Sequence, residues 1–256
     1  MKKILVIGDS CIDEYVYGYS DRLCPEAPVP VFEPSYTKKI DGMAMNVLNN
    51  IENFKLVNCD IVTNRFVKPI KIRYVDDVSN QMLLRVDDKD KIDRIPLSIL
   101  NNINFLEYDA VIISDYNKGF LIEQDIEYIS QFNTLTFLDT KKKIGNWAKK
   151  IDFIKINMKE YVNNRGWLDH KYRNDLIITH SNNGAFHINN GKKTLIPVEN
   201  EVDVMDVSGA GDTFLAGFVI KYLETNDVEG SVKFANRCAS WVITQKGVVV
   251  VDPQKI

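Results

Sequence analysis

Short β-branched runs alternate with longer amphipathic segments along most of this 256-residue chain, and this alternation restricts the possible fold more than any other feature. It is typical of a mainly parallel sheet with helices on both faces. Residues 122–132 have the spacing of one such helix. The expected strands cover residues 3–7, 55–62, 109–115, 134–140, 152–157 and 175–180. The sequence therefore predicts an α/β fold.

Two regions, residues 14–40 and 71–88, break this alternation. Both are rich in Tyr, Val, Pro and turn residues, a composition that favours extended strands leaving the main sheet. We expect them to form a small β appendage. Because no repeat or linker divides the chain, residues 1–256 are expected to form a single domain.

Composition and charge exclude several classes of partner. A net charge of −3 gives no basic surface for nucleic acid. The apolar runs are far shorter than the ~20 residues of a membrane helix, so we expect a cytoplasmic protein with no membrane partner. The cysteines show no paired metal-ligand spacing and are interpreted as structural thiols; they are Cys11, Cys24, Cys59 and Cys238.

The stretch DVMDVSGAGDTFLAGF, residues 203–218, places two glycines and an acid directly before an apolar run. From Asp212 onward the apolar residues recur at helical spacing, so a helix is expected to begin at the glycines. Backbone N–H groups and the helix dipole would make an anion site there. Asp212 could then accept the proton of an attacking hydroxyl. Taken alone, the motif fits an ordinary helix start with Asp as its cap somewhat better than it fits a catalytic anion site.

The motif DVSGAGDTF, residues 206–214, resembles the C-terminal signature of the ribokinase-like (PfkB) carbohydrate kinases. Residues 6–33, 114–119, 156–161 and 234–240 are also similar to this family and follow its order. The PEAPVPV segment is particularly similar to the kinase domain of the heptose-7-phosphate kinase and heptose-1-phosphate adenylyltransferase enzymes. The resemblance implies a ribokinase-like three-layer sandwich whose appendage is a β lid formed by residues 14–40 and 71–88. It also implies transfer of the γ-phosphoryl group of ATP to a sugar hydroxyl.

The resemblance assigns the phosphoryl-transfer chemistry to the glycine motif. Asp212 would be the base that takes the proton from the sugar hydroxyl. The backbone amides of Gly209, Ala210 and Gly211 would hold the transferred group.

The resemblance also implies two metal sites. Asn157 and Glu160 match a pair that holds Mg²⁺ through water, although the same spacing fits a helix cap followed by a surface acid. Asp206 and Ser208 are placed to hold a monovalent cation such as K⁺.

The matching positions divide the remaining ligand residues between sugar and nucleotide. The sugar-binding positions are Asp9, Asp13, Gly42, Asn46, Asp115 and Lys118. With Asn157, the ATP-binding positions are Lys141, Thr179, Asn183, Gly184, Asn236 and Gly247. Lys71, Arg73 and Arg85 on the lid fit either a solvated strand face or a clamp on a phosphate that the sugar already carries.

The chain departs from the family pattern at several points. Met43 and Met45 replace small residues where the backbone should approach the sugar. The usual Asp-Pro-Lys is Asp-Thr-Lys at residues 139–141, and residues 51–71 are short by about one helix. No adenylyltransferase domain follows Ile256, so we expect a stand-alone kinase.

Three further expectations concern activity and assembly. Two alternatives to an active heptose-phosphate kinase stay open. One is a kinase-fold regulatory protein that binds sugar or nucleotide without turnover, and the other is a kinase of another sugar or of a nucleoside. A small sheet with one bare face is marginal in water, so we expect a homodimer through the lid, with Val29, Val31 and Tyr74 among the residues that need cover.

Overall fold

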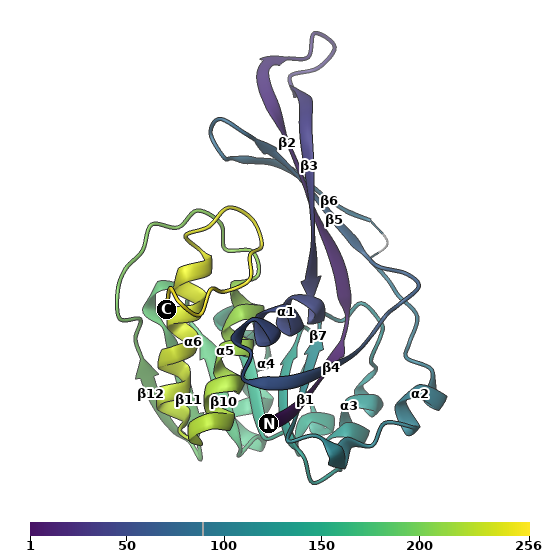
Figure 1. Cartoon of the computed structure of the whole chain (residues 1–256), viewed down its shortest axis with the longest axis vertical. Helices are drawn as coiled ribbons and strands as arrows, with labels where there is room; N and C mark the ends of the chain where they lie inside the picture. Colours follow the sequence, from purple (N-terminus) through teal and green to yellow (C-terminus); the bar gives the residue numbers. More distant parts are fainter. Residues whose placement is uncertain (89) are drawn as a thin grey trace.

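A computed structural model of the chain describes residues 1–88 and 90–256. Its main sheet has eight strands in the order β12-β11-β10-β9-β8-β7-β1-β4 (Figure 1). The six strands from β4 to β10 are parallel, whereas β11 is antiparallel to both of its neighbours, β10 and β12. The strands are β1 (Lys2–Gly8), β4 (Val57–Thr63), β7 (Ala110–Asp115), β8 (Leu135–Thr140), β9 (Phe153–Asn157), β10 (Asp175–Thr179), β11 (Ala185–Asn189) and β12 (Lys192–Ile196). The predicted α/β fold is confirmed.

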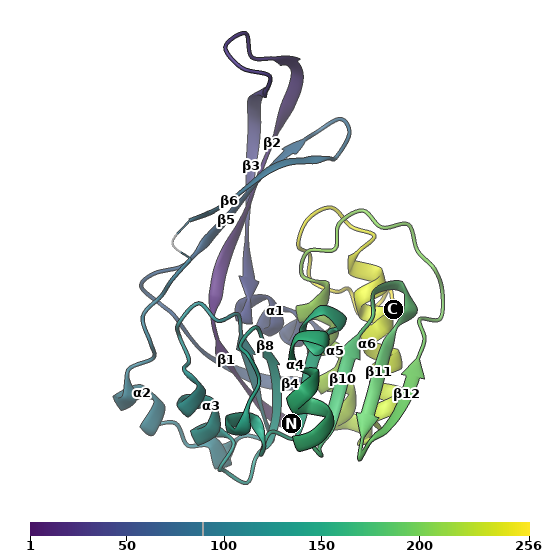
Figure 2. The ribbon, with the colours of Figure 1, turned by 180° about the vertical axis from the view of Figure 1, so that it is seen from behind.

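Helices cover both faces of the main sheet and complete the three layers (Figures 1 and 2). Ile4 and Val6 of β1 pack toward α1, α5 and α6, whereas Leu5 and Ile7 face the opposite layer. Alternate residues of a strand point to opposite faces, so both faces of a central strand must be apolar. The helices are α1 (Ala44–Phe54), α2 (Leu97–Asn101), α3 (Glu123–Ile129), α4 (Met158–Lys171), α5 (Ala210–Thr225) and α6 (Val228–Val242), with short 3₁₀ turns η1 (Phe105–Glu107), η2 (Asn146–Ala148) and η3 (Ser181–Asn183).

A second sheet of four strands, in the order β3-β2-β5-β6, forms the β lid. Figure 2 shows its long hairpin, β2 and β3, projecting away from the three layers. Its strands are β2 (Ser10–Leu23), β3 (Pro30–Met43), β5 (Ile70–Asp76) and β6 (Met82–Asp88). The lid therefore draws on both segments that interrupt the α/β alternation.

A buried ion pair anchors the lid where it leaves the main sheet. Arg73 of β5 lies 2.5 Å from Asp13 of β2, and both side chains are at most 10% exposed. The Arg73 guanidinium also lies over the Tyr15 ring, 5.0 Å from its centroid. A Cβ on Gly42 of β3 would lie 2.0 Å from Asp13 Oδ2, so a larger residue at this position would displace the carboxylate that pairs with Arg73. The lid base is thus held by charge and close packing together.

Among the residues that the structure describes, no helix is long and apolar enough to cross a membrane.

β4 is followed within a few residues by β5, which agrees with the short segment expected at residues 51–71.

Candidate active site

The glycine motif forms the start of α5, as the sequence predicts. Gly209 caps the helix with φ +80°, a left-handed conformation that L side chains adopt rarely. A Cβ at this position would also lie 2.9 Å from Asn46 Nδ2. Asp212 follows in the first helical turn. The local fold therefore places one carboxylate beside the N–H groups of a helix start, of which that of Ala210 donates to the Val207 carbonyl at 3.3 Å.

The carboxylate of Asp212 is 4% exposed and receives two side-chain hydrogen bonds. The Tyr116 hydroxyl donates to Oδ1 at 2.6 Å, and Asn46 Nδ2 donates to Oδ2 at 3.1 Å. Burial raises the pKa of Asp212 to about 6, because these two donors only partly offset the loss of solvation. A carboxyl with this pKa is ionised at neutral pH and is still a useful proton acceptor.

A buried lysine lies beside the same helix start. Lys155 of β9 is 5% exposed, and a Cβ on Gly211 would lie 3.1 Å from its Nζ. Lys155 Nζ donates to Asp139 Oδ2 at 2.5 Å. Burial alone would raise the pKa of Asp139, but the ammonium groups of Lys155 and Lys141 hold it below its usual value. The cation and the α5 amides together suit a negatively charged group.

Asn157 is the last residue of β9 and caps α4, and Glu160 lies in the first turn of α4. The Asn157 side chain accepts from the Glu160 N–H at 2.9 Å, and Glu160 Oε2 accepts from the Asn157 N–H at 2.8 Å. This reciprocal pair is a capping box, which is the alternative that the spacing allowed. Glu160 also pairs with Lys141 at 2.5 Å. Because Lys141 lies 3.6 Å from Asp139, these charges form one network.

Several of these groups line one cleft of about 940 Å³ at the carboxyl ends of the strands; Asp212 lies behind its wall, next to the lining residues Tyr116 and Gly211. Its polar wall includes Tyr116, Asp139, Lys141, Lys155, Asn157 and Gly211. Its apolar wall includes Val198, Val202, Val204, Val207, Phe214 and Ile243. A cleft with one charged end and one apolar end suits a ligand with a polyanion joined to a flat ring.

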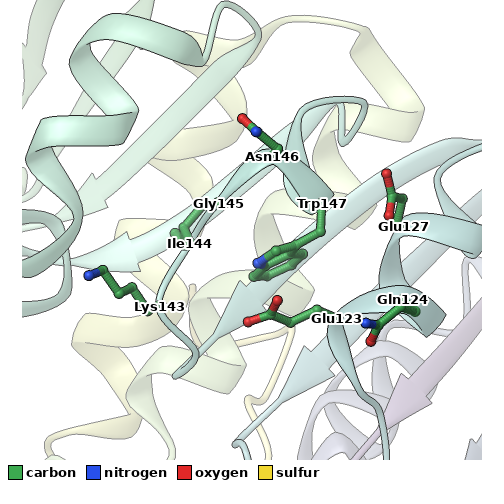
Figure 3. A pocket seen from close by; sticks show the side chains of 8 residues that line it. All are labelled: Glu123, Gln124, Glu127, Lys143, Ile144, Gly145, Asn146 and Trp147. Atoms are coloured by element: carbon green, nitrogen blue, oxygen red, sulfur yellow. The ribbon is translucent and has the colours of Figure 1, made fainter.

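A second hollow of about 440 Å³ lies between α3 and η2 (Figure 3). Glu123 and Glu127 line it from the α3 side, and Lys143 and Trp147 line it from the segment that follows β8. It shares no lining residue with the larger cleft. The linked charges of Asp139, Lys141 and Lys155 line the larger cleft and not this hollow.

Comparison with known proteins identifies the family. Residues 78–255, more than half of the chain, match the pfkB family carbohydrate kinase. The chain belongs to the pfkB carbohydrate kinase family. It is therefore a carbohydrate kinase, a phosphotransferase with an alcohol group as acceptor, and the family implies the use of ATP.

Curated relatives are similar along the whole kinase. The bifunctional protein HldE of Helicobacter pylori (strain HPAG1) is 30% identical over 313 residues, covering 100% of this chain and 66% of the relative. The bifunctional protein HldE of a Nitratiruptor species is 28% identical and is covered over 64% of its length. The chain thus spans about two thirds of the length of the curated relatives that it matches.

Solved structures share the fold at low sequence identity. The ribokinase of Thermotoga maritima is 16% identical, with a TM-score of 0.75 and coverage of 98% of this chain and 97% of the other. The Arabidopsis thaliana ribokinase, solved with ribose and ATP, is 15% identical, with a TM-score of 0.73 and coverage of 97% and 95%. Phosphofructokinase-2 of Escherichia coli, in complex with potassium, is 14% identical, with a TM-score of 0.71 and coverage of 100% and 97%. The ribokinase-like fold expected from the sequence is confirmed.

Two carboxylates expected to hold the sugar serve the kinase's own framework in this structure. Asp9 is fully buried and accepts backbone N–H bonds from Tyr116, Lys118 and Phe120 at 2.6–3.2 Å. Asp115 is 1% exposed and pairs with Lys142 at 2.6 Å. Their contact with a sugar stays a prediction.

The cationic residues expected at the sugar also have protein partners. Arg73 pairs with Asp13 in the lid base, and Lys118 pairs with Asp90. Arg85 is exposed and forms two bonds to Asp87, at 2.7 and 2.8 Å, on its own strand. Of the positions named for the sugar, Asn46 donates directly to Asp212 at 3.1 Å.

The nucleotide positions divide into two groups. Thr179, Gly184 and Asn236 line the cleft, together with Lys141 and Asn157. Asn183 and Gly247 are not among its lining residues. A Cβ on Gly247 would lie 3.4 Å from the Tyr15 ring, at the lid base.

The candidate site contains two residues that sequence reasoning missed. Tyr116 lies between two positions of the SDYNKG motif that were named, and Lys155 is a charged residue within a buried strand. Lysines are almost never buried without a partner, so the sequence IKIN already signals a paired cation. For Tyr116 the sequence carries no comparable signal.

Proposed function

We propose that this kinase transfers the γ-phosphoryl group of ATP to a hydroxyl of a sugar that already carries a phosphate, of the heptose 7-phosphate type. One observation carries the proposal. The buried carboxylate of Asp212 lies in the first turn of α5, directly after Ala210 and Gly211, which line the cleft. Similarity to the HldE proteins supports the heptose class.

The proposed chemistry follows from the positions of these groups. Asp212 accepts the proton of the sugar hydroxyl as its oxygen attacks the γ-phosphorus, and ADP leaves from the opposite side. The amides of Gly209, Ala210 and Gly211 hold the equatorial oxygens, and Lys155 adds a positive charge beside them. Because these donors are fixed by the helix start, little reorganisation is needed during the reaction.

The donor set fits Mg²⁺ held through water. Asn157 and Glu160 already bond to each other, so their remaining lone pairs would receive water molecules rather than the ion itself. Asp139 Oδ1 is buried on the same wall and has no hydrogen-bond partner among the described residues. When bound, the ion would neutralise charge on the phosphates.

Asp206 and Ser208 offer a weaker fit to a monovalent cation. Asp206 Oδ1 accepts from the Ser208 N–H at 2.8 Å, and the Tyr15 hydroxyl lies 3.5 Å from Oδ2. The carboxylate nonetheless keeps free lone pairs, and the related Escherichia coli phosphofructokinase-2 contains potassium. Replacing K⁺ by a large organic cation in the assay should lower turnover; unchanged turnover would exclude K⁺ from the mechanism.

A free lysine supports a substrate that is already phosphorylated. Lys71 of β5 has no carboxylate within 4.0 Å among residues 1–88 and 90–256, unlike Arg73 and Arg85. Its Nζ lies 5.0 Å from the centroid of the Tyr116 ring, beside the base. An unpaired cation at the sugar side of the base suits a phosphate on the acceptor.

The test is ADP release from ATP and Mg²⁺ with matched pairs of free and phosphorylated sugars, including heptose and heptose 7-phosphate. We expect turnover with the phosphorylated member of a pair, and a rise in its KM in Lys71→Met. Lys68→Met is the matched control, because Lys68 is a nearby lysine paired with Asp41 at 3.2 Å. Preference for free sugars or for nucleosides would contradict the proposed substrate class.

We also propose that the outer lid face forms a homodimer. Opposite residues of paired strands share a face, and Tyr74 faces both Val16 of β2 and Leu84 of β6. Leu84 and Val86 are 56% and 40% exposed on this face. The other face carries the buried Tyr15 and Arg73. Leu84→Asp should convert a dimer into a monomer in sedimentation; a wild-type monomer at micromolar concentration would refute the interface.

A further inference from the structure

Tyr116 occupies a position that the family assignment alone does not explain. It follows β7, and its hydroxyl lies 2.6 Å from Oδ1 of Asp212. This distance is the one at which an acceptor hydroxyl would have to lie for proton transfer. A phenol is a poor acid at neutral pH, and burial next to Asp212 raises the pKa of Tyr116 well above its usual value. The hydroxyl therefore donates a hydrogen bond and keeps its proton.

The position of the hydroxyl is fixed from three sides. The Tyr116 N–H donates to the fully buried Asp9 carboxylate at 2.6 Å, which holds the backbone. The ring lies near two ammonium groups, with Lys71 of the lid 5.0 Å and Lys141 of the main sheet 5.4 Å from its centroid. Cation–π contacts of this kind restrain a ring without using its hydroxyl. The hydroxyl is thus left free to serve Asp212.

Tyr116 and Asn46 divide the Asp212 carboxylate between them. One donates to Oδ1 and the other to Oδ2, so the plane of the carboxylate is fixed. An ionised carboxylate has about four lone-pair directions, so each oxygen keeps a lone pair that could accept from a substrate hydroxyl. Donors to the ionised form also favour that form over the protonated one.

We propose that Tyr116 is a positioning residue that holds Asp212 in the orientation and the ionised form in which it can act as the base. The proposal rests on the proposed role of Asp212. In this role the phenol acts on the reaction only through Asp212, and it does not itself transfer the phosphoryl group.

The other charges around Asp212 do not replace this donor. Asp139 on β8 raises the pKa of Asp212 and Lys155 on β9 lowers it, but neither hydrogen-bonds to its carboxylate. Lys141 is engaged with Glu160. Cys11 on β2 stays a neutral thiol, because burial raises its pKa to about 12. Among the described residues, Tyr116 and Asn46 are the two side-chain donors to this carboxylate.

The test is the pH dependence of kcat/KM in Tyr116→Phe, which keeps the ring between the lysines and removes the donor. Losing a donor raises the pKa of Asp212, so the acidic limb should move to higher pH by about one pH unit. The rate should fall about tenfold well below the limb and much less above it. Tyr116→Leu should move the limb in the same direction, which covers the case in which the first variant folds poorly.

Tyr172→Phe is the matched control, because its buried hydroxyl bonds to the Ile151 and Asp152 carbonyls at 3.0 and 3.2 Å, outside the cleft. It should leave the limb unchanged. Equal losses at all pH values in both Tyr116 variants, or a limb that does not move, would overturn the proposal. Asp212→Asn separates the two claims. Near-normal turnover in that variant would show that Asp212 is not the base. If Asp212→Asn is inactive but the acidic limb does not move in the Tyr116 variants, only the role of Tyr116 is refuted.

Discussion

Replacing Asp212 by Asn should make the protein more stable at neutral pH while it removes the proposed base. Asparagine has the same shape and can keep both neighbours. Its amide oxygen can accept from Asn46, and its NH₂ can donate to the Tyr116 hydroxyl, which is able to accept. The substitution therefore removes a buried charge without leaving an unpaired polar atom.

The size of the effect follows from the burial of Asp212. Burial raises its pKa from 3.8 to about 6, so the folded state holds this proton more tightly than the unfolded chain. Ionisation therefore lowers stability as the pH rises through this window. At about 1.4 kcal/mol per pH unit, the rise corresponds to about 3 kcal/mol at pH 7.5. The advantage of the variant should grow by about 2 kcal/mol between pH 4.5 and pH 7.5.

Urea unfolding of wild type and Asp212→Asn at several pH values measures this difference. Asp13→Asn is the control of opposite sign, because it leaves the buried Arg73 without its carboxylate and should destabilise the protein at pH 7.5. Two results would contradict this reasoning. One is a stability difference between wild type and Asp212→Asn that does not change with pH, and the other is a variant that is less stable than wild type at pH 7.5. Either would show that ionisation of the buried Asp212 does not lower the free energy of unfolding.

Two further predictions concern the lid and the nucleotide. Arg73→Met should lower the free energy of unfolding by about 3 kcal/mol, because the buried Asp13 loses its partner, and it should also raise the sugar KM. Arg85→Met removes the exposed pair with Asp87 and should cost less; an equal loss of stability in both variants would contradict the role of burial. ATP with Mg²⁺ at 100 times its Kd should stabilise the protein by about 2.7 kcal/mol, seen as a higher Tm, and no shift at millimolar ATP would contradict nucleotide binding in the cleft.

Local chemistry explains what the sequence predicted correctly. The helix start at residues 209–212 was predictable because glycine conformation and apolar spacing are properties of neighbouring residues. The sheet was predictable because a strand such as Ile4–Ile7, apolar on both faces, must be covered by two layers. Both inferences need no knowledge of distant contacts.

Contacts between distant segments explain what the sequence could not give. Tyr116 reaches Asp212 across 96 residues, and no local pattern distinguishes this tyrosine from one in an ordinary turn. In the same way, a carboxylate after a strand can face a ligand or the protein itself. Asp9 faces backbone N–H groups, and Asp13 faces an arginine. Which groups surround a charge is decided by the assembled fold.

The central claim is that Asp212 is the base of a sugar-phosphate kinase, and turnover of Asp212→Asn tests it most directly. ADP release and sugar phosphorylation are measured with saturating ATP, Mg²⁺ and the best sugar phosphate found for the wild type. We predict that turnover falls by ~10²–10⁴, the usual range for a positioned general base, while the ATP-induced rise in Tm is retained. Turnover close to that of the wild type, with ATP still bound, would contradict the account.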